Sequence, residues 1–408
     1  MRYRVAVTGL GAVTPLGTGV AAFVEGLRQG LSGARTIDVF DASTLSTRIA
    51  AQSFPRPSPD SRDRKVLFAL EAADEAMAQA CAPGTRPGAS APDGFVSMGV
   101  GLELFSMDDL AASRRPGFSL PSDPNTRRAF LQTPADACVH LLSVAHGLRR
   151  PPLTLVSACA AGTDAIGVAA RAIADGRRGW SLAGGTDSMI NPLGVAGFGA
   201  LSATTTRNDD PTAASRPFDR TRDGFLLGEG AGVLVLERWD DALQRGAPIL
   251  GEIVGYGTSF DAYGISEPHP EGRGALLAMQ RALADARLSA DQICLVNAHG
   301  TSTPKNDVVE TIALKRLFGE RAARVPVTAM KSMIGHLISG AGAVETVGAF
   351  ACLQRGFTSP TVNLTEPDPA CDLDYVPLVS REGPVRFVLK NSFAFGGQNA
   401  ALVLGAAP

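Results

Sequence analysis

One cysteine stands where a buried strand is expected to give way to a helix. Cys159 follows the β-type run of residues 154–156 and precedes an apolar, helix-spaced stretch at residues 163–174. A thiol at a helix N-terminus meets backbone N–H groups and the positive end of the helix dipole, and both favour the thiolate. The small neighbours Ala160, Ala161 and Gly162 allow a substrate to come close. This setting indicates a nucleophile that attacks a carbonyl carbon and holds an acyl group as a thioester.

Two histidines occupy comparable turns. His299 follows the apolar run of residues 293–297, and His336 lies in a glycine-flanked turn shortly after Lys331. Loops at strand ends are where α/β folds gather their catalytic groups, so we expect both imidazoles to lie near Cys159. The remaining histidines and cysteines lack such settings, and we interpret them as packing or surface residues: His140, His146, His269, Cys81, Cys138, Cys294, Cys352 and Cys371.

Metal and nucleotide sites are not indicated by the motifs. No histidine or cysteine pair has a ligand spacing such as CxxC, HxxxH or HExxH, so no metal is expected. The segment that starts at Gly9 and Gly11 lacks the third glycine of GxGxxG, and the glycines at 228–232 lead into a strand. We therefore expect no nucleotide cofactor.

Composition describes a compact protein with a large core. The chain has 408 residues, of which 45% are hydrophobic and 19% charged, and its formal net charge is −2. This balance gives no sign of nucleic-acid binding, and no stretch approaches the ~18 apolar residues of a membrane span. The six cysteines are scattered without a disulfide framework. We expect reduced thiols and a cytoplasmic location.

Short β-type runs alternate with helical patterns nearly throughout, which predicts an α/β fold with a covered sheet. Strands are expected at 5–8, 154–156, 181–183, 232–236, 293–297, 325–327, 385–389 and 400–404, and helices at 163–174, 274–286 and 342–353. The glycine-rich strand pattern at 249–257 echoes the start of the chain, which is compatible with two similar halves, 1–247 and 248–408. Residues 101–135, including Glu103, Leu104, Phe105 and Met107, and residues 202–223 are expected to be excursions over the core.

Five blocks of sequence resemble one family in its own order. They are VAVTGLGAVTPLG at 5–17, SACAAGTDAIG at 157–167, NAHGTSTPKND at 297–307, KSMIGHLISGAGAVE at 331–345 and NSFAFGGQNA at 391–400. The chain resembles, over nearly its whole length, the elongating β-ketoacyl-[acyl-carrier-protein] synthases of fatty-acid synthase II and the ketosynthase α subunits of type II polyketide systems. The resemblance implies a thiolase fold, a five-layered αβαβα arrangement of two similar halves that forms dimers.

The same resemblance implies a decarboxylative Claisen condensation in fatty-acid, polyketide or polyene synthesis. Cys159 would accept the acyl group, while His299 and His336 would polarise the malonyl thioester carbonyl as decarboxylation generates an enolate. The substrates would arrive on the phosphopantetheine of an acyl carrier protein, with no resident cofactor. The partner subunit would be a second copy or a chain-length-factor-like chain.

Further site residues follow from the resemblance alone. Lys331 and Glu345 match a supporting pair, and Thr301 and Thr303 match positions that contact the pantetheine arm. The backbone N–H groups of Cys159 and Phe395 match the oxyanion donors. Three aromatic residues match positions that gate or shield the substrate: Phe198, Phe393 and Phe395.

Two other functions fit some of these residues. A ketosynthase-like partner could keep the fold and bind carrier protein without turnover, although the intact cysteine and histidines argue against this. A cysteine hydrolase would use Cys159 and one histidine, with water as acceptor. The second histidine argues against hydrolysis, which does not need it.

Overall fold

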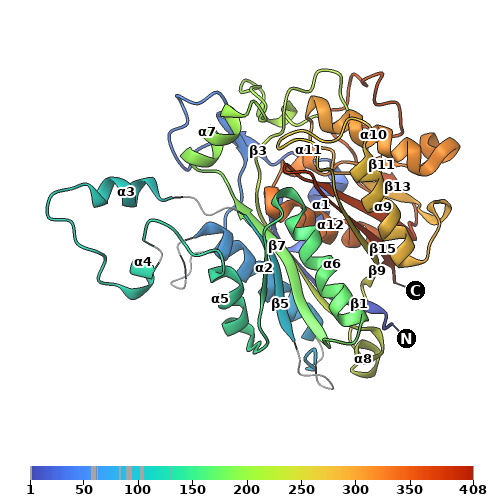
Figure 1. Ribbon diagram of the computed structural model, residues 1–408, viewed down its shortest axis with the longest axis horizontal. Coiled ribbons are helices and arrows are strands. Elements are labelled where there is room, and N and C mark those ends of the chain that lie inside the picture. Colours follow the sequence, from blue (N-terminus) through green and yellow to red (C-terminus); the bar gives the residue numbers. More distant parts are fainter. Residues whose placement is uncertain are drawn as a thin grey trace.

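The computed structural model describes residues 2–56, 61, 63–81, 84–88, 94–101, 105–128 and 130–407 (Figure 1). One mixed sheet crosses the whole molecule, and β2 (Gly17–Thr18) pairs with its central strand β1. Its other strands follow one another in space in the order β11 (Val327–Thr328), β10 (Leu295–Asn297), β14 (Phe387–Phe393), β15 (Gln398–Ala406), β9 (Gly251–Phe260), β1 (Val5–Thr14), β8 (Glu229–Arg238), β7 (Trp180–Ser188), β5 (Phe95–Val100) and β6 (Leu153–Leu155).

The sheet consists of two halves with the same topology. When the five strands of each half are numbered along the chain, both halves have the spatial order third, second, fourth, fifth, first. The first strands, β1 and β9, meet in the middle through only two residue pairs, Ala6 with Glu252 and Val7 with Gly251. This repeat agrees with the echo between residues 5–11 and 249–257. The division at 247/248 falls in the loop between α8 (Trp239–Gln244) and β9, and these bounds stay a prediction.

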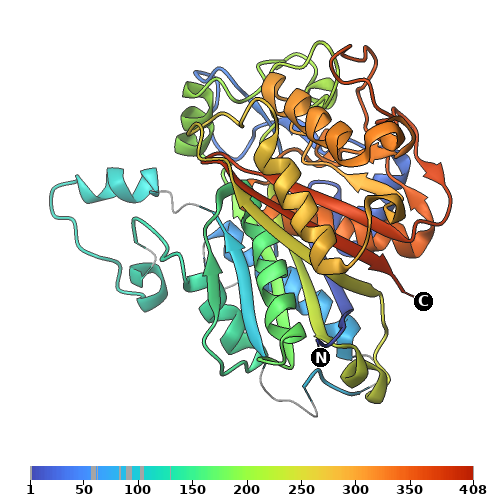
Figure 2. The ribbon, with the colours of Figure 1, turned by 45° about the vertical axis from the view of Figure 1, so that its right-hand side comes forward.

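The two half-sheets form two layers of the fold, and helices form the other three. Between the half-sheets lie α6 (Ala161–Ala174) and α12 (Ala341–Arg355), each in contact with strands of both halves. The outer face of the first half carries α2 (Arg64–Cys81) and α5 (Ala137–His146), and that of the second carries α9 (Arg273–Ala286) with α10 (Pro304–Phe318) beside it (Figure 2). The predicted five-layered αβαβα fold is confirmed.

The middle layer can form because its helices are apolar and carry small residues. In α12 every residue from Ala341 to Cys352 is buried, as expected for a helix covered on all sides. The two middle helices approach closely at Gly162, where an added Cβ would lie 2.8 Å from the carbonyl oxygen of Ser339 and 2.9 Å from the amide nitrogen of Ala343. Backbone contact at this point places the N-terminal ends of both helices side by side.

The expected elements are present, with shifted ends. The strand expected at 5–8 continues to residue 14, and β11 contains only Val327 of the three residues expected. The strands expected at 385–389 and 400–404 extend towards each other, because β14 runs to Phe393 and β15 begins at Gln398. Helices α6, α9 and α12 lie within two residues of the predicted bounds. Short apolar runs located the buried strands but not the polar residues that continue them.

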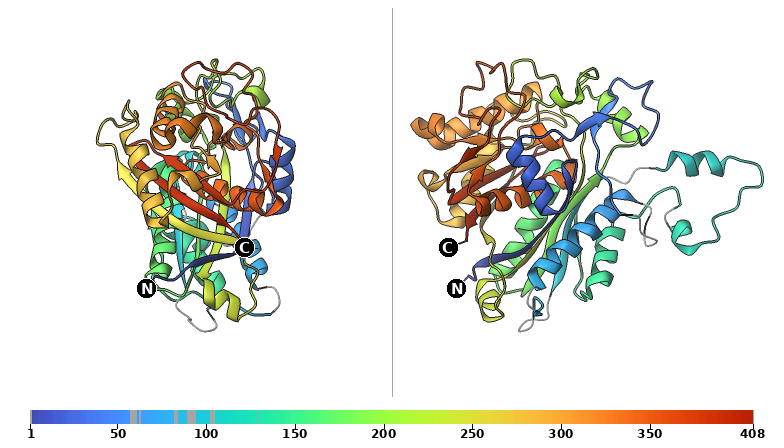
Figure 3. Two further views of the ribbon diagram at one scale, coloured as in Figure 1. Left: turned by 90° about the vertical axis from the view of Figure 1, so that its right-hand side faces the viewer. Right: turned by 180° about the vertical axis from the view of Figure 1, so that it is seen from behind.

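The two predicted excursions differ in structure. The first carries α3 (Met107–Ser113) and α4 (Pro124–Arg128) and projects from the body of the protein (Figures 1 and 3). Of the residues singled out there, Phe105 and Met107 are exposed, whereas Glu103 and Leu104 lie outside the described residues. The second, residues 202–223, folds back on the core, where Phe218 is fully buried and stacks on Tyr375.

No helix in the described ranges is long and apolar enough to cross a bilayer. The six cysteines all lie in the described ranges, and none of them forms a disulfide there.

Candidate active site

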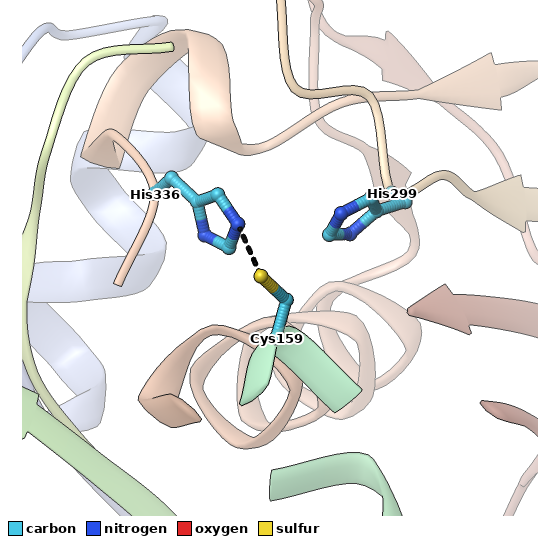
Figure 4. Close-up of side chains that lie close together, drawn as sticks. All are labelled: Cys159, His299 and His336. Carbon is cyan, nitrogen blue, oxygen red and sulfur yellow. Dashed lines mark hydrogen bonds between the residues drawn. The ribbon is translucent and has the colours of Figure 1, made fainter. Parts of the chain in front are cut away.

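The structure brings Cys159, His299 and His336 together (Figure 4). Cys159 lies in a 3-10 turn, η1 (Ala158–Ala160), directly before α6, and its Sγ is 3.2 Å from Nε2 of His336. The rings of His299 and His336 meet edge to face, with centroids 5.3 Å apart. All three side chains are buried. A thiol and two imidazoles from both halves of the chain therefore share one enclosed space.

Unusual backbone conformations hold these residues in place. Ala158, immediately before the nucleophile, has a φ of 48°, and Ile338, two residues after His336, has a φ of 44°. Both values lie in the left-handed region that residues with a Cβ rarely adopt. Gly335 has a φ of 68°, and an added Cβ there would lie 2.9 Å from the carbonyl oxygen of Leu226. Such turns aim side chains that a regular helix or strand would direct elsewhere.

Burial controls the resting state of Cys159. Desolvation raises the pKa of its thiol to about 11, against the opposing effects of the Lys331 ammonium and of the backbone N–H groups of Phe395 and Cys159. The thiol is therefore protonated at neutral pH. The helix N-terminus alone predicted a favoured thiolate, and that expectation is wrong for the resting site because the loss of water outweighs the helix dipole.

Both histidines are neutral at neutral pH. Burial, reinforced by the charge of Lys331, holds the pKa of His299 and that of His336 well below the usual value. The backbone N–H of Ile338 donates to Nδ1 of His336 at 3.1 Å, so the proton of that ring lies on Nε2, which faces Cys159. The backbone N–H of His299 donates to the Glu310 carboxylate at 2.9 Å. Neutral rings can donate an N–H to an oxygen that becomes negative.

The expected pair of Lys331 and Glu345 is formed directly behind His299. Nζ of Lys331 donates to Glu345 Oε1 and, at 2.7 Å, to the carbonyl oxygen of His299. Both side chains are almost completely buried. A second ammonium, that of Lys390, lies 2.8 Å from the other oxygen of Glu345. Sequence reasoning missed Lys390, although a lysine inside the buried run of β14 was a readable signal.

A pocket with a volume of about 280 Å³ leads to the three side chains. Its lining includes all five residues expected to contact substrate: Thr301, Thr303, Phe198, Phe393 and Phe395. The hydroxyls of Thr301 and Thr303 are 2.9 Å apart, and the ring of Phe393 meets His299 edge to face at 6.0 Å between centroids. An apolar pocket with a few polar groups at its wall suits a thin, flexible arm that carries a reactive group.

Two acids near the site, Asp187, which is buried, and Asp164, which is half-buried, make contacts that the sequence did not reveal. Asp187 accepts the backbone N–H of Ser339 at 2.9 Å, and burial raises its pKa to about 6. Asp164, in the first turn of α6, accepts hydrogen bonds from the hydroxyls of Ser157 at 2.5 Å and Tyr256 at 2.8 Å. These bonds join the turn of the nucleophile to β9 of the other half.

A metal ion is the other use that cysteine and histidine side chains allow. One ligand atom from each of Cys159, His299 and His336 lies within 4.8 Å of the other two, and these residues form the candidate ligand cluster of the described chain. Two nitrogens and a sulfur would suit zinc. The raised pKa of the thiol disfavours the thiolate that zinc requires. The expectation that the site works without metal stays a prediction.

Comparisons with known proteins show which family the chain belongs to. Residues 2–242 match the N-terminal domain of beta-ketoacyl synthase, and residues 250–365 match its C-terminal domain. A 3-oxoacyl-[acyl-carrier-protein] synthase 2 of Synechocystis sp. is 41% identical over 98% of this chain and 97% of its own length. The fold is similar to a ketosynthase solved in complex with its type II polyketide synthase acyl-carrier protein and bound to the hexaketide (TM-score 0.89, 30% identity), and to the ishigamide ketosynthase/chain length factor (TM-score 0.87, 33% identity), each covering all of both chains. The chain therefore belongs to the β-ketoacyl synthase family, and its activity is that of a β-ketoacyl-[acyl-carrier-protein] synthase, a condensation in fatty-acid or polyketide synthesis.

Proposed function

We propose that Cys159 carries the growing acyl group and that His299 and His336 activate malonyl-acyl-carrier protein for decarboxylative condensation. The observation that supports this assignment is the meeting of one thiol and two neutral imidazoles at the end of one pocket. A hydrolase needs a single histidine that accepts the thiol proton. Here Nε2 of His336 already carries a proton towards the sulfur, which suits donation rather than base catalysis.

In the first step the Cys159 sulfur attacks the thioester carbon of the acyl carrier. The bond between that carbon and the pantetheine sulfur breaks, and the thiol proton leaves with the pantetheine sulfur. The tetrahedral oxyanion is stabilised by the backbone N–H groups of Cys159 and Phe395, which already point at the sulfur and oppose its raised pKa. The acyl group then remains on Cys159 as a thioester.

In the second step malonyl-carrier protein occupies the same pocket. The bond to its carboxylate breaks, carbon dioxide leaves, and the electron pair forms an enolate whose oxygen accepts N–H donors from His299 and His336. The enolate carbon attacks the acyl carbon, a carbon–carbon bond forms, and the Cys159 thiolate departs and regains a proton. Donors that are fixed before the charge develops need no reorganisation, which is why neutral, buried imidazoles suit this step.

The proposed supporting roles follow from position. Lys331 fixes the carbonyl oxygen of His299, and Glu345 fixes Lys331. Thr301 and Thr303 line the wall of the pocket, where their hydroxyls can bind the amides of a pantetheine arm. Three aromatic residues surround the acyl group: Phe198, Phe393 and Phe395. No resident cofactor is needed, because the carrier's phosphopantetheine delivers both substrates.

We propose an acyl carrier protein and a second ketosynthase-like subunit as partners. The names of the Synechocystis relative and of the solved complexes support both. Strand β6 forms one edge of the sheet, where Leu153 at its start is 40% exposed and Val156 just after its end is 59% exposed. An edge strand that exposes backbone hydrogen-bonding groups and apolar side chains favours pairing with another chain. The mate is an identical chain or a chain-length-factor-like chain. Six cysteines that form no disulfide in the described structure support a cytoplasmic location.

Mass spectrometry of the intact protein tests the assignment of Cys159. Incubation with an acyl-carrier thioester is expected to add one acyl mass, which maps to Cys159 and is lost when malonyl-carrier protein is added. The Cys159→Ala variant is expected to gain no adduct, whereas Cys294→Ala, which removes an exposed cysteine, is expected to behave as the wild type. An acyl group found on another residue, or hydrolysed to free acid without malonyl carrier, would contradict the proposal.

Size measurement in solution tests the subunit partner. The chain alone, and the chain produced together with a candidate chain-length-factor-like protein, would be compared by light scattering at micromolar concentration. A dimer of either kind is expected. A stable monomer in both samples would overturn the proposed assembly.

A further inference from the structure

Lys390 is a lysine in the middle of β14, in which every residue from Val388 to Phe393 is buried. It stands between Leu389 and Asn391, which are both buried, and its side chain is 0% exposed. Nζ donates to the carbonyl oxygen of Asn391 and to Oγ of Ser392, both at 2.6 Å, and lies 2.8 Å from Oε2 of Glu345. Every contact of the ammonium group is therefore with buried protein groups.

These contacts connect both sides of the active site. Glu345 also accepts a hydrogen bond from Nζ of Lys331, which donates as well to the carbonyl oxygen of His299. On the other side, Oγ of Ser392 lies 2.8 Å from Oγ1 of Thr163, in the first turn of the helix that follows the nucleophile. Lys390 is thus the central group of a buried polar chain that joins the loop of His299 to the helix of Cys159.

Stability alone does not account for a charge at this position. Removing an ammonium from water is costly, and one carboxylate, Glu345, is shared here by two ammonium groups. Burial lowers the pKa of Lys390 to about 8, so the group still carries its charge at neutral pH. An apolar side chain such as that of neighbouring Leu389 would fill the strand at lower cost. Residues that lower stability in this way, such as a charge buried in a strand, concentrate at functional sites.

We propose that Lys390 is a positioning residue of the condensation step: its ammonium group fixes Glu345 and Ser392 and adds a second positive charge beside His299 and His336. The inference rests on the proposed roles of the two histidines. Positive charge at this place keeps both imidazoles neutral. It also stabilises the negative enolate oxygen to which the imidazole N–H groups donate hydrogen bonds.

The pKa values of His299 and His336 depend on the charged and titratable groups that surround the two rings. Burial is the main cause of the lowered pKa of His299 and of His336, and the charges of Lys331 and Lys390 add to it for both. The groups that face this space are Cys159 from η1, Asp187 from β7, Glu310 from α10, Lys331 from α11 (Lys331–Ile334), Glu345 from α12 and Lys390 from β14. Loss of the Lys390 charge therefore raises the pKa of both histidines.

The test separates acylation from condensation in the full-length protein. Lys390→Met removes the charge and keeps the length of the side chain, and Lys315→Met removes the charge of an exposed lysine as the matched control. Acylation of Cys159 is expected to stay within about twofold of the wild type. Single-turnover condensation from the acylated enzyme is expected to fall by at least about twofold at pH 6 and by less at pH 8, because loss of the charge raises the pKa of both histidines and moves the acidic limb to higher pH. Lys315→Met is expected to match the wild type in both.

A second variant excludes a purely structural effect. Lys390→Ala leaves a cavity beside Glu345 and Ser392, and ethylammonium chloride is expected to restore condensation in it with saturation, whereas sodium chloride is not. A wild-type pH profile in Lys390→Met, or equal losses at pH 6 and pH 8 without rescue of Lys390→Ala, would overturn the inference. If Lys390→Met does not fold, the rescue alone decides. Failure of the wild type to condense would instead overturn the proposed function.

Discussion

Replacement of Lys331 by methionine probes the buried cation that holds His299. The change removes the donor to the His299 carbonyl oxygen and to Glu345 Oε1. A hydrogen bond to a charged group contributes about 1.5–3 kcal/mol. Breaking a buried pair costs about 3–5 kcal/mol when it leaves an uncompensated charge. In Lys331→Met the carboxylate of Glu345 still has Lys390 at 2.8 Å, so its charge is compensated and the range for a hydrogen bond applies. The free energy of unfolding is therefore expected to fall by about 2–3 kcal/mol.

The same change should slow the chemistry of Cys159. The charge of Lys331 is the largest influence that opposes burial and lowers the pKa of this thiol, so its loss raises the pKa further. The thiolate is the species that reacts, and one pKa unit changes its fraction about tenfold. Alkylation of Cys159 by iodoacetamide at pH 8 is therefore expected to slow by up to about tenfold. The rate must be followed on the Cys159 peptide by mass spectrometry, because the exposed Cys294 reacts as well.

Lys390→Met is the control for this experiment. It removes a neighbouring buried charge that acts on both histidines, but that charge is not among the largest influences on the pKa of Cys159. Alkylation of Cys159 is expected to slow in Lys331→Met and to stay unchanged in Lys390→Met. Equal rates in the wild type and Lys331→Met, or equal slowing in both variants, would refute the electrostatic reasoning.

Three further predictions concern pH and packing. Burial raises the pKa of Asp187 to about 6 from 3.8, so the protonated carboxyl stabilises the folded state below pH 3.8, and this contribution is lost as the pH rises through 6. Asp187→Asn should therefore remove a pH dependence of the free energy of unfolding of roughly 3 kcal/mol between pH 4 and 7. Urea unfolding at both pH values measures it. The lowered pKa of His299 and His336 keeps both rings neutral below pH 6.5, so single-turnover condensation should persist at pH 6, and a fall centred at pH 6.5 would contradict neutral donors. Gly162→Ala forces a Cβ against Ser339 and should destabilise the protein by about 1–3 kcal/mol in thermal unfolding, whereas Gly197→Ala, on an open helix face, should be neutral or slightly stabilising.

The sequence predicted the parts of the fold and site that depend on local pattern. Buried strands are short apolar runs, and turns at their ends are marked by glycine, which located Cys159, His299 and His336 before any contact was known. The reaction class followed from the order of the motifs, and the family comparison confirmed it. The five substrate-facing residues line the pocket as expected, while their roles stay a prediction.

Features that depend on distant contacts were not predictable in the same way. The protonated thiol of Cys159 results from desolvation by segments far away in the chain, which a helix N-terminus does not reveal. Lys390 and Glu345 are 45 positions apart, and only the fold brings them to 2.8 Å. Polar residues extend β14 and β15 because their backbone groups pair across the hairpin, whatever their side chains.

The central claim is that two neutral histidines drive condensation onto the acyl group of Cys159. The most direct test follows malonyl-carrier protein labelled in its free carboxylate during a single turnover with the acylated enzyme. We expect one equivalent of labelled carbon dioxide for each β-ketoacyl product, and a persistent acyl group on Cys159 without product in His299→Ala and His336→Ala. Product that retains the label, or unchanged turnover in both variants, would contradict the account.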